Sequence, residues 1–111
     1  MAREFLTEYE LMILLAILRV GDDAYGVRIA REIERTAGRS IVLGAVYATL
    51  DRLEANGLVT SALGEPTAER GGRAKRYFEV TRDGLRAVRQ AQRALTALWR
   101  GIPRLQRGSS A

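Results

Sequence analysis

Four basic side chains gather in the second half of the chain and could bind phosphate groups. They fall within seven positions: Arg70, Arg73, Lys75 and Arg76. Guanidinium and ammonium groups hold phosphate oxygens through charge-assisted hydrogen bonds. The paired glycines Gly71-Gly72 lie among them and allow a backbone to approach its ligand closely. This segment predicts non-covalent binding to a polyanion.

The residue types of the chain indicate that it is not an enzyme. Its 111 residues include no histidine and no cysteine, so the usual N/S metal sites and the Ser-His and Cys-His nucleophiles are unavailable. Asp22 and Asp23 follow Gly21 and are more typical of a turn and helix cap than of a catalytic pair. We expect no enzymatic activity, no metal site and no cofactor.

The charge is unevenly distributed, which also favours a polyanionic partner. The net charge is +5; residues 1–34 hold four Arg and seven acidic residues, and residues 35–111 hold fourteen basic and six acidic ones. A basic surface that only aids solubility is the alternative. The longest apolar run, residues 11–18, is shorter than the roughly 18 residues of a membrane span. With no cysteine and no signal sequence, we expect one domain in the cytoplasm.

The first half of the chain predicts three helices in succession. Thr7 and Glu10 form a capping box before an apolar run, and that run is apolar nearly all round, which predicts burial against its own domain and a second surface. A second helix is expected over residues 25–37, with Gly38 ending it. Its outer residues, Arg28, Arg31, Glu32 and Arg35, are mixed in charge and predict a solvated face, with a phosphate contact from Arg28 or Arg31 as the alternative.

The third helix lies within Ser40–Gly57 and has an unusual outer face. Its predicted core stripe consists of Leu43, Val46, Leu50 and Leu53. The opposite face is almost bare and consists of Gly44, Ala45, Ala48, Arg52 and Ala55, with Tyr47 beside it. A bare face indicates close approach of a partner, either another helix or a nucleic-acid groove. The spacing fits a helix-turn-helix, and it also fits any three-helix bundle.

The segments after Gly57 favour the nucleic-acid interpretation. Residues 58–63 and 76–80 are short and β-rich, and a Gly- and Pro-containing loop joins them, so a hairpin is expected with the basic segment at its tip. A basic loop beside a bare helix fits contact with a phosphate backbone or a minor groove. The fold class is therefore mainly α with a small β-hairpin.

Several short motifs, in order over about residues 6–100, together resemble the PadR family of winged-helix transcriptional regulators. They are Thr7-Glu8-Tyr9-Glu10, Asp23-Ala24-Tyr25-Gly26, Leu43-Gly44-Ala45-Val46-Tyr47, Leu50-Asp51-Arg52-Leu53-Glu54, Gly57-Leu58-Val59, and Gly71-Gly72-Arg73 to Tyr77 followed by Thr81. The resemblance implies a winged helix-turn-helix domain, expected over residues 1–80, and a dimerisation helix, expected over 81–102. The residues after Gly101 separately predict a disordered tail over 103–111.

The resemblance also implies a function and its residues. Relatives bind operator DNA as homodimers and usually repress transcription. The implied recognition surface is Gly44, Ala45, Tyr47, Ala48 and Thr49, with Arg52 beside it, and the implied wing is Arg70, Arg73, Lys75 and Arg76. Many relatives carry proline or a larger residue where this chain has Ala48, so no operator preference is carried over. The alternative is a winged-helix module that packs on another protein without DNA specificity.

The last helix independently predicts a homodimer. Thr81 can cap it, and a heptad seam follows: Leu85, Val88, Gln92, Leu95 and Trp99. Such a seam is too long for one small domain to cover. Trp99 is also the candidate ligand residue, because some drug-sensing relatives stack planar compounds on a tryptophan of this helix. An interface anchor is the simpler role, and the sequence identifies no effector.

Overall fold

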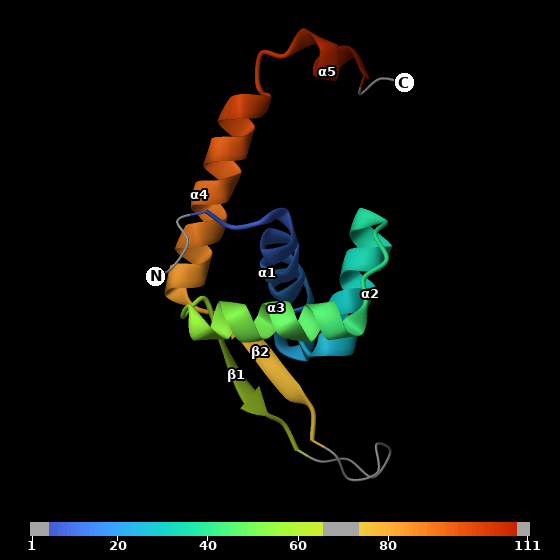
Figure 1. Cartoon of the computed structure of the whole chain (residues 1–111), viewed down its shortest axis with the longest axis vertical. Helices are drawn as coiled ribbons and strands as arrows, with labels where there is room; N and C mark the ends of the chain where they lie inside the picture. Colours follow the sequence, from blue (N-terminus) through green and yellow to red (C-terminus); the bar gives the residue numbers. More distant parts are fainter. Residues whose placement is uncertain (1–4, 66–73, 109–111) are drawn as a thin grey trace.

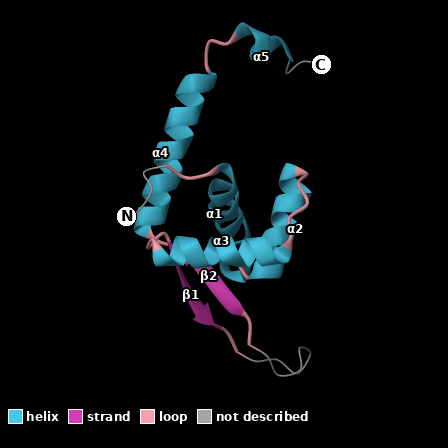
Figure 2. Cartoon of the chain, in the orientation of Figure 1, coloured by secondary structure: helices cyan, strands magenta, loops and turns pink. Residues whose placement is uncertain are grey.

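The order of helices and strands agrees with the predicted winged-helix arrangement. A computed structural model describes residues 5–65 and 74–108 (Figure 1). The elements are α1 (Glu8–Val20), the 3-10 turn η1 (Gly21–Asp23), α2 (Gly26–Ala37), α3 (Leu43–Ala55), β1 (Val59–Leu63), β2 (Arg76–Val80), α4 (Arg82–Trp99) and α5 (Pro103–Gly108). Helices predominate, and β1 and β2 form an antiparallel hairpin (Figure 2).

Local hydrogen bonds fix the starts and ends of the helices. The Thr7 hydroxyl accepts from the Glu10 amide at 3.1 Å and the Glu10 carboxylate accepts from the Thr7 amide at 2.9 Å, so the predicted capping box is confirmed. Gly38 ends α2 in the left-handed conformation, as expected. The Thr81 hydroxyl accepts from the Gly84 amide at 3.0 Å and thereby caps α4.

The third helix lies within the predicted range, Ser40–Gly57, and begins at Leu43. Its N-cap is Val42, and Ser40 donates its hydroxyl to Glu34 instead of capping α3. Leu43 is therefore the first helical residue and is 39% exposed, so its predicted place in the core stripe was wrong. The other three members of the stripe, Val46, Leu50 and Leu53, are fully buried.

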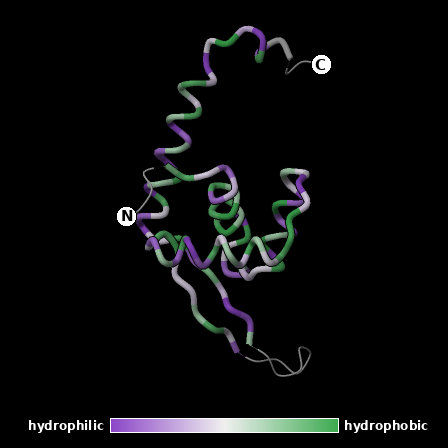
Figure 3. The backbone as a smooth tube through the Cα atoms, viewed as in Figure 1, coloured by the Kyte–Doolittle hydropathy of each residue, from purple (hydrophilic) through white to green (hydrophobic). Residues whose placement is uncertain are grey.

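The hydrophobic core lies where α1, α2 and α3 meet the hairpin. Its largest fully buried apolar side chains include Ile13, Leu14, Ile29, Leu50, Leu53 and Val46, and Val59 and Phe78 contribute from the two strands. The hairpin register pairs Val59 with Val80 and Ser61 with Phe78. The predominantly hydrophobic colour of α1 in Figure 3 agrees with its central position.

The helix α4 contributes Val88 to this core, and its C-terminal half and α5 project away from it. In Figure 1, α4 rises from the hairpin and carries α5 at one end of the molecule, while the hairpin points to the opposite end. Residues 103–108 form the short helix α5, where the sequence predicted the start of a disordered tail. Proline suits the first position of a helix because its fixed φ is already helical. No helix among the described residues combines the length and the hydropathy that crossing a membrane requires.

Candidate nucleic-acid interface

The first half of α3 offers an exposed surface without charges. Gly44, Ala45, Tyr47 and Ala48 are all exposed, and no heavy atom lies within 4 Å of the position that a Cβ would take at Gly44. The second half carries exposed charges on Asp51, Arg52 and Glu54. The bare part of this face is therefore narrower than predicted and lies at the N-terminal end, which is the end that enters the major groove in helix-turn-helix proteins.

One residue of the predicted recognition surface is not on the exposed face. Thr49 is only 1% exposed, and its hydroxyl accepts a hydrogen bond of 3.2 Å from the guanidinium of Arg52. Thr49 follows Val46 by three residues and precedes Leu53 by four, so helical spacing places it in the core stripe. The predicted surface position of Thr49 was wrong, and the sequence already contained the signal.

Tyr47 is held against the start of α2. A Cβ built on Gly26, the first residue of α2, would lie 2.5 Å from the Tyr47 hydroxyl oxygen and 2.7 Å from Cε1. Only glycine leaves room for the tyrosine ring at this position. This contact fixes the ring, which remains 41% exposed beside the bare face of α3. The contact joins residues of two different helices, so the local sequence around Gly26 does not reveal that it shapes this surface.

The structure places two of the four predicted wing cations. Arg70 and Arg73 lie outside the described residues. Lys75 is partly buried, and its ammonium lies 3.9 Å from the centre of the Tyr25 ring. Arg76 is exposed and donates a hydrogen bond of 2.8 Å to the Ser61 hydroxyl, which in turn donates to the Glu54 carboxylate at 2.8 Å. This chain of bonds connects both strands of the hairpin to the C-terminal end of α3.

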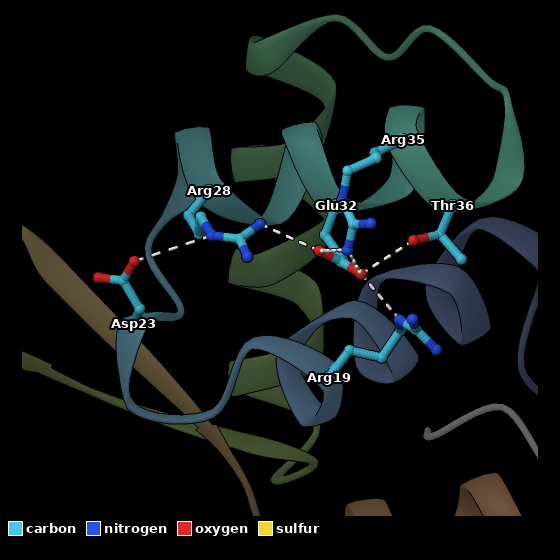
Figure 4. A network of polar contacts seen from close by, with 6 residues as sticks. All are labelled: Arg19, Asp23, Arg28, Glu32, Arg35 and Thr36. Carbon is cyan, nitrogen blue, oxygen red and sulfur yellow. Dashed lines mark hydrogen bonds and ion pairs between the residues drawn. The ribbon is translucent and has the colours of Figure 1, made fainter.

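A buried carboxylate joins α1 to α2, contrary to the predicted solvated face of α2. Glu32 is 2% exposed and accepts hydrogen bonds from Arg19, Arg28, Arg35 and Thr36 (Figure 4). The contacts to Arg19, Arg35 and Thr36, opposed by burial, hold the pKa of the Glu32 carboxyl far below its ordinary value of 4.5. The arginines around Glu32 are thus part of the link between the helices. Arg31, in contrast, is exposed, as predicted.

The predicted dimer seam divides into a packed part and an exposed part. Val88 is buried against the protein's own core and Leu85 is partly buried, whereas Gln92, Leu95 and Trp99 are exposed. The exposed part borders a groove of about 620 Å³ between α1 and α4, which Leu15 and Val88 also line. Leu15 and Leu18 of α1 are exposed as well, so α1 retains an apolar surface that its own domain does not cover.

Comparison with known proteins gives a consistent result. A family model described as the transcriptional regulator PadR-like family matches residues 14–90. A solved transcriptional regulator from Clostridium thermocellum, Cth-833, is 25% identical over 80% of this chain and 83% of its own, with a TM-score of 0.68. The hsRosR-S1 chain in a complex structure is 25% identical over 95% of this chain and 87% of its own, with a TM-score of 0.67.

A further structure supports the fold alone. A PadR-like transcriptional regulator from Bacillus cereus has a TM-score of 0.71 over 88% of this chain and 90% of its own, at 18% identity. No curated protein matches the sequence.

Proposed function

The chain belongs to the PadR-like family of transcriptional regulators, and we propose that it binds operator DNA as a homodimer and represses transcription. The observation that carries this proposal is the exposed, uncharged first half of α3. A helix face without long side chains brings its backbone close to the groove that it enters. Sequence preference then depends mainly on DNA shape and phosphate contacts, because few side chains can reach base edges.

The proposed contacts divide between α3 and the hairpin. Gly44, Ala45, Tyr47 and Ala48 enter the groove, and Arg52 lies beside them. Arg70, Arg73 and Arg76 supply positive charge to the phosphate backbone. Thr49 is left out because it is buried. Arg76 can serve this role because it is exposed, although Ser61 already accepts one of its hydrogen bonds.

The exposed part of the heptad seam supports the proposed homodimer. Leu95, Leu98 and Trp99 are large, apolar and exposed, and they lie on one helix that projects from the core. A second copy would cover them, and large aromatic residues often anchor such interfaces. Two subunits would place two copies of α3 on successive half-sites of the DNA.

Binding to the protein's own upstream promoter over a range of salt concentrations tests this function. With about four phosphates neutralised per subunit, the logarithm of the binding constant should fall with log salt at a slope near −7. The promoter duplex should bind more tightly than a scrambled duplex. The same slope without preference would place the operator elsewhere. Absence of binding at low salt would contradict the proposal and favour a module that packs on another protein.

Fluorescence of Trp99, the single tryptophan of the chain, tests the ligand role separately. Quenching by planar aromatic compounds in the dimer would support an effector site in the groove. An unchanged emission would leave Trp99 as an interface anchor.

A further inference from the structure

The base of the wing is attached to the turn that precedes α2. The Phe78 amide donates to the Ala24 carbonyl at 2.8 Å, and Tyr77 forms an isolated antiparallel bridge with Tyr25. β2 therefore has a second neighbour on the side that β1 does not occupy. Because residues 24 and 25 directly precede α2, this contact sets the angle between the hairpin and the helix-turn-helix.

Aromatic and cationic side chains reinforce the same junction. The Tyr25 and Tyr77 rings meet edge to face, with 5.7 Å between their centres. Lys75 places its ammonium 3.9 Å from the centre of the Tyr25 ring, which is within the range of a cation–π interaction. Gly64 accommodates the Tyr77 ring, since an added Cβ would lie 2.6 Å from Cε1. The Gly64 amide also donates to the Lys75 carbonyl at 2.7 Å.

These contacts continue to the exposed face of α3. Tyr25 immediately precedes Gly26, and Gly26 is the residue that the Tyr47 ring covers. One continuous set of contacts therefore runs from Lys75 through Tyr25 and Gly26 to Tyr47. The orientation of the wing and the position of the recognition surface depend on the same few residues.

We propose that Lys75 is a positioning residue, which fixes the wing through the Tyr25 ring and contributes to DNA binding without contacting a phosphate. The inference deepens the proposed function and rests on it only for the DNA measurement. A lysine at a wing would ordinarily be assigned to the phosphate backbone. Here its ammonium lies over an aromatic ring and the residue is partly buried, while its neighbour Arg76 is exposed.

Amide hydrogen exchange tests the positioning role without DNA. Lys75→Gln should speed exchange of the Phe78 amide about two- to fivefold, the size expected for loss of one cation–π contact. Tyr25→Leu should have at least this effect, and adding Lys75→Gln to it should change little further. Lys75→Arg should restore slow exchange. The amide of Ile13 in the core should exchange at the wild-type rate, which would show that the variant is not globally unfolded.

The salt dependence of DNA binding provides the second measurement. Lys75→Gln should weaken DNA binding about two- to fivefold with the salt slope unchanged, whereas loss of a phosphate contact would lower the slope by about 0.9 per subunit. Arg89→Gln, which removes an exposed charge on α4, controls for net charge. A lowered slope for Lys75→Gln, or unchanged exchange at Phe78, would overturn the inference. If the wild type binds no DNA, the proposed function fails, and the exchange result still decides the role of Lys75.

Discussion

The ring of Tyr47 lies directly over Gly26, so that the exposed face of α3 and the first residue of α2 share one contact. An added Cβ at residue 26 would lie within 2.7 Å of both the Tyr47 hydroxyl oxygen and Cε1. The ring can yield only by leaving its place beside the bare face. This contact connects the absence of one side chain on α2 to the position of another on α3.

Replacing Gly26 with alanine should therefore cost both stability and DNA binding. We expect a loss of about 1–3 kcal/mol in the free energy of unfolding, typical of an overpacked site. Gly44→Ala is the matched control, because Gly44 is helical and has open space around it. That variant should be neutral or up to about 1 kcal/mol more stable. Urea denaturation measures the free energy of unfolding of both variants. Equal effects of the two substitutions would contradict the steric explanation.

The Glu32 carboxylate should make stability depend on acid pH. Its folded pKa lies below the ordinary value of 4.5, so its contribution is fully present above that pH and is lost as the pH falls below it. Glu32→Gln should unfold at lower urea than the wild type at pH 7, and the difference between them should shrink between pH 4.5 and pH 2.5.

Glu34→Gln on the same helix is the control for Glu32→Gln. Glu34 is exposed and its carboxylate accepts only the Ser40 hydroxyl among the hydrogen bonds described. Its substitution should shift the urea midpoint little at any pH. A difference between the wild type and Glu32→Gln that remains constant down to pH 2.5 would show that the carboxylate charge does not stabilise the fold.

The sequence predicted the elements whose signals are local. The Thr7 capping box, the left-handed Gly38 and the Thr81 cap each depend on a few consecutive residues, and all are present. The third helix also lies within the predicted range Ser40–Gly57, and the Ser40 hydroxyl donates a hydrogen bond to Glu34.

Features that depend on tertiary contacts were not predictable in the same way. In the sequence, Glu32 is one charge on a mixed helix face. Only the tertiary contact with Arg19 of α1 makes it a buried link between the two helices. Likewise, the sequence indicates that Lys75 is a wing cation, and only the structure shows that its ammonium lies over the Tyr25 ring. The role of Gly26 depends on a ring that comes from a different helix. Thr49 is the exception, because its spacing from Val46 and Leu53 indicated burial.

A carboxylate on the bare face of α3 should abolish DNA binding without unfolding the protein. Ala45 is exposed, so Ala45→Glu should leave the free energy of unfolding, measured by urea denaturation, unchanged within about 0.5 kcal/mol. Negative charge close to phosphates and added bulk in the groove should together reduce affinity for the promoter at least a hundredfold, about 2.7 kcal/mol. Ala94→Glu, an exposed alanine on α4, is the matched control. Retained binding by Ala45→Glu would show that another face contacts DNA.

Trp99 should matter for self-association and hardly at all for folding of the single chain. It is 63% exposed in the isolated subunit, whereas Val88 on the same seam is buried in the core. Trp99→Ala should weaken dimerisation at least about thirtyfold, roughly 2 kcal/mol, as expected for an aromatic anchor at an interface. Val88→Ala should instead lower the free energy of unfolding by about 1–3 kcal/mol.

Sedimentation over a range of protein concentrations measures dimerisation, and so separates the effect of Trp99→Ala on association from the effect of Val88→Ala on folding. Val42→Ala controls for the loss of an exposed apolar side chain away from α4, and it should dimerise as the wild type does. A wild-type protein that remains monomeric at high concentration would contradict the proposed dimer. Unimpaired dimerisation of Trp99→Ala would instead place the interface on another surface, such as the exposed Leu15 and Leu18 of α1. The exposed half of α4 would then need a different partner to cover it.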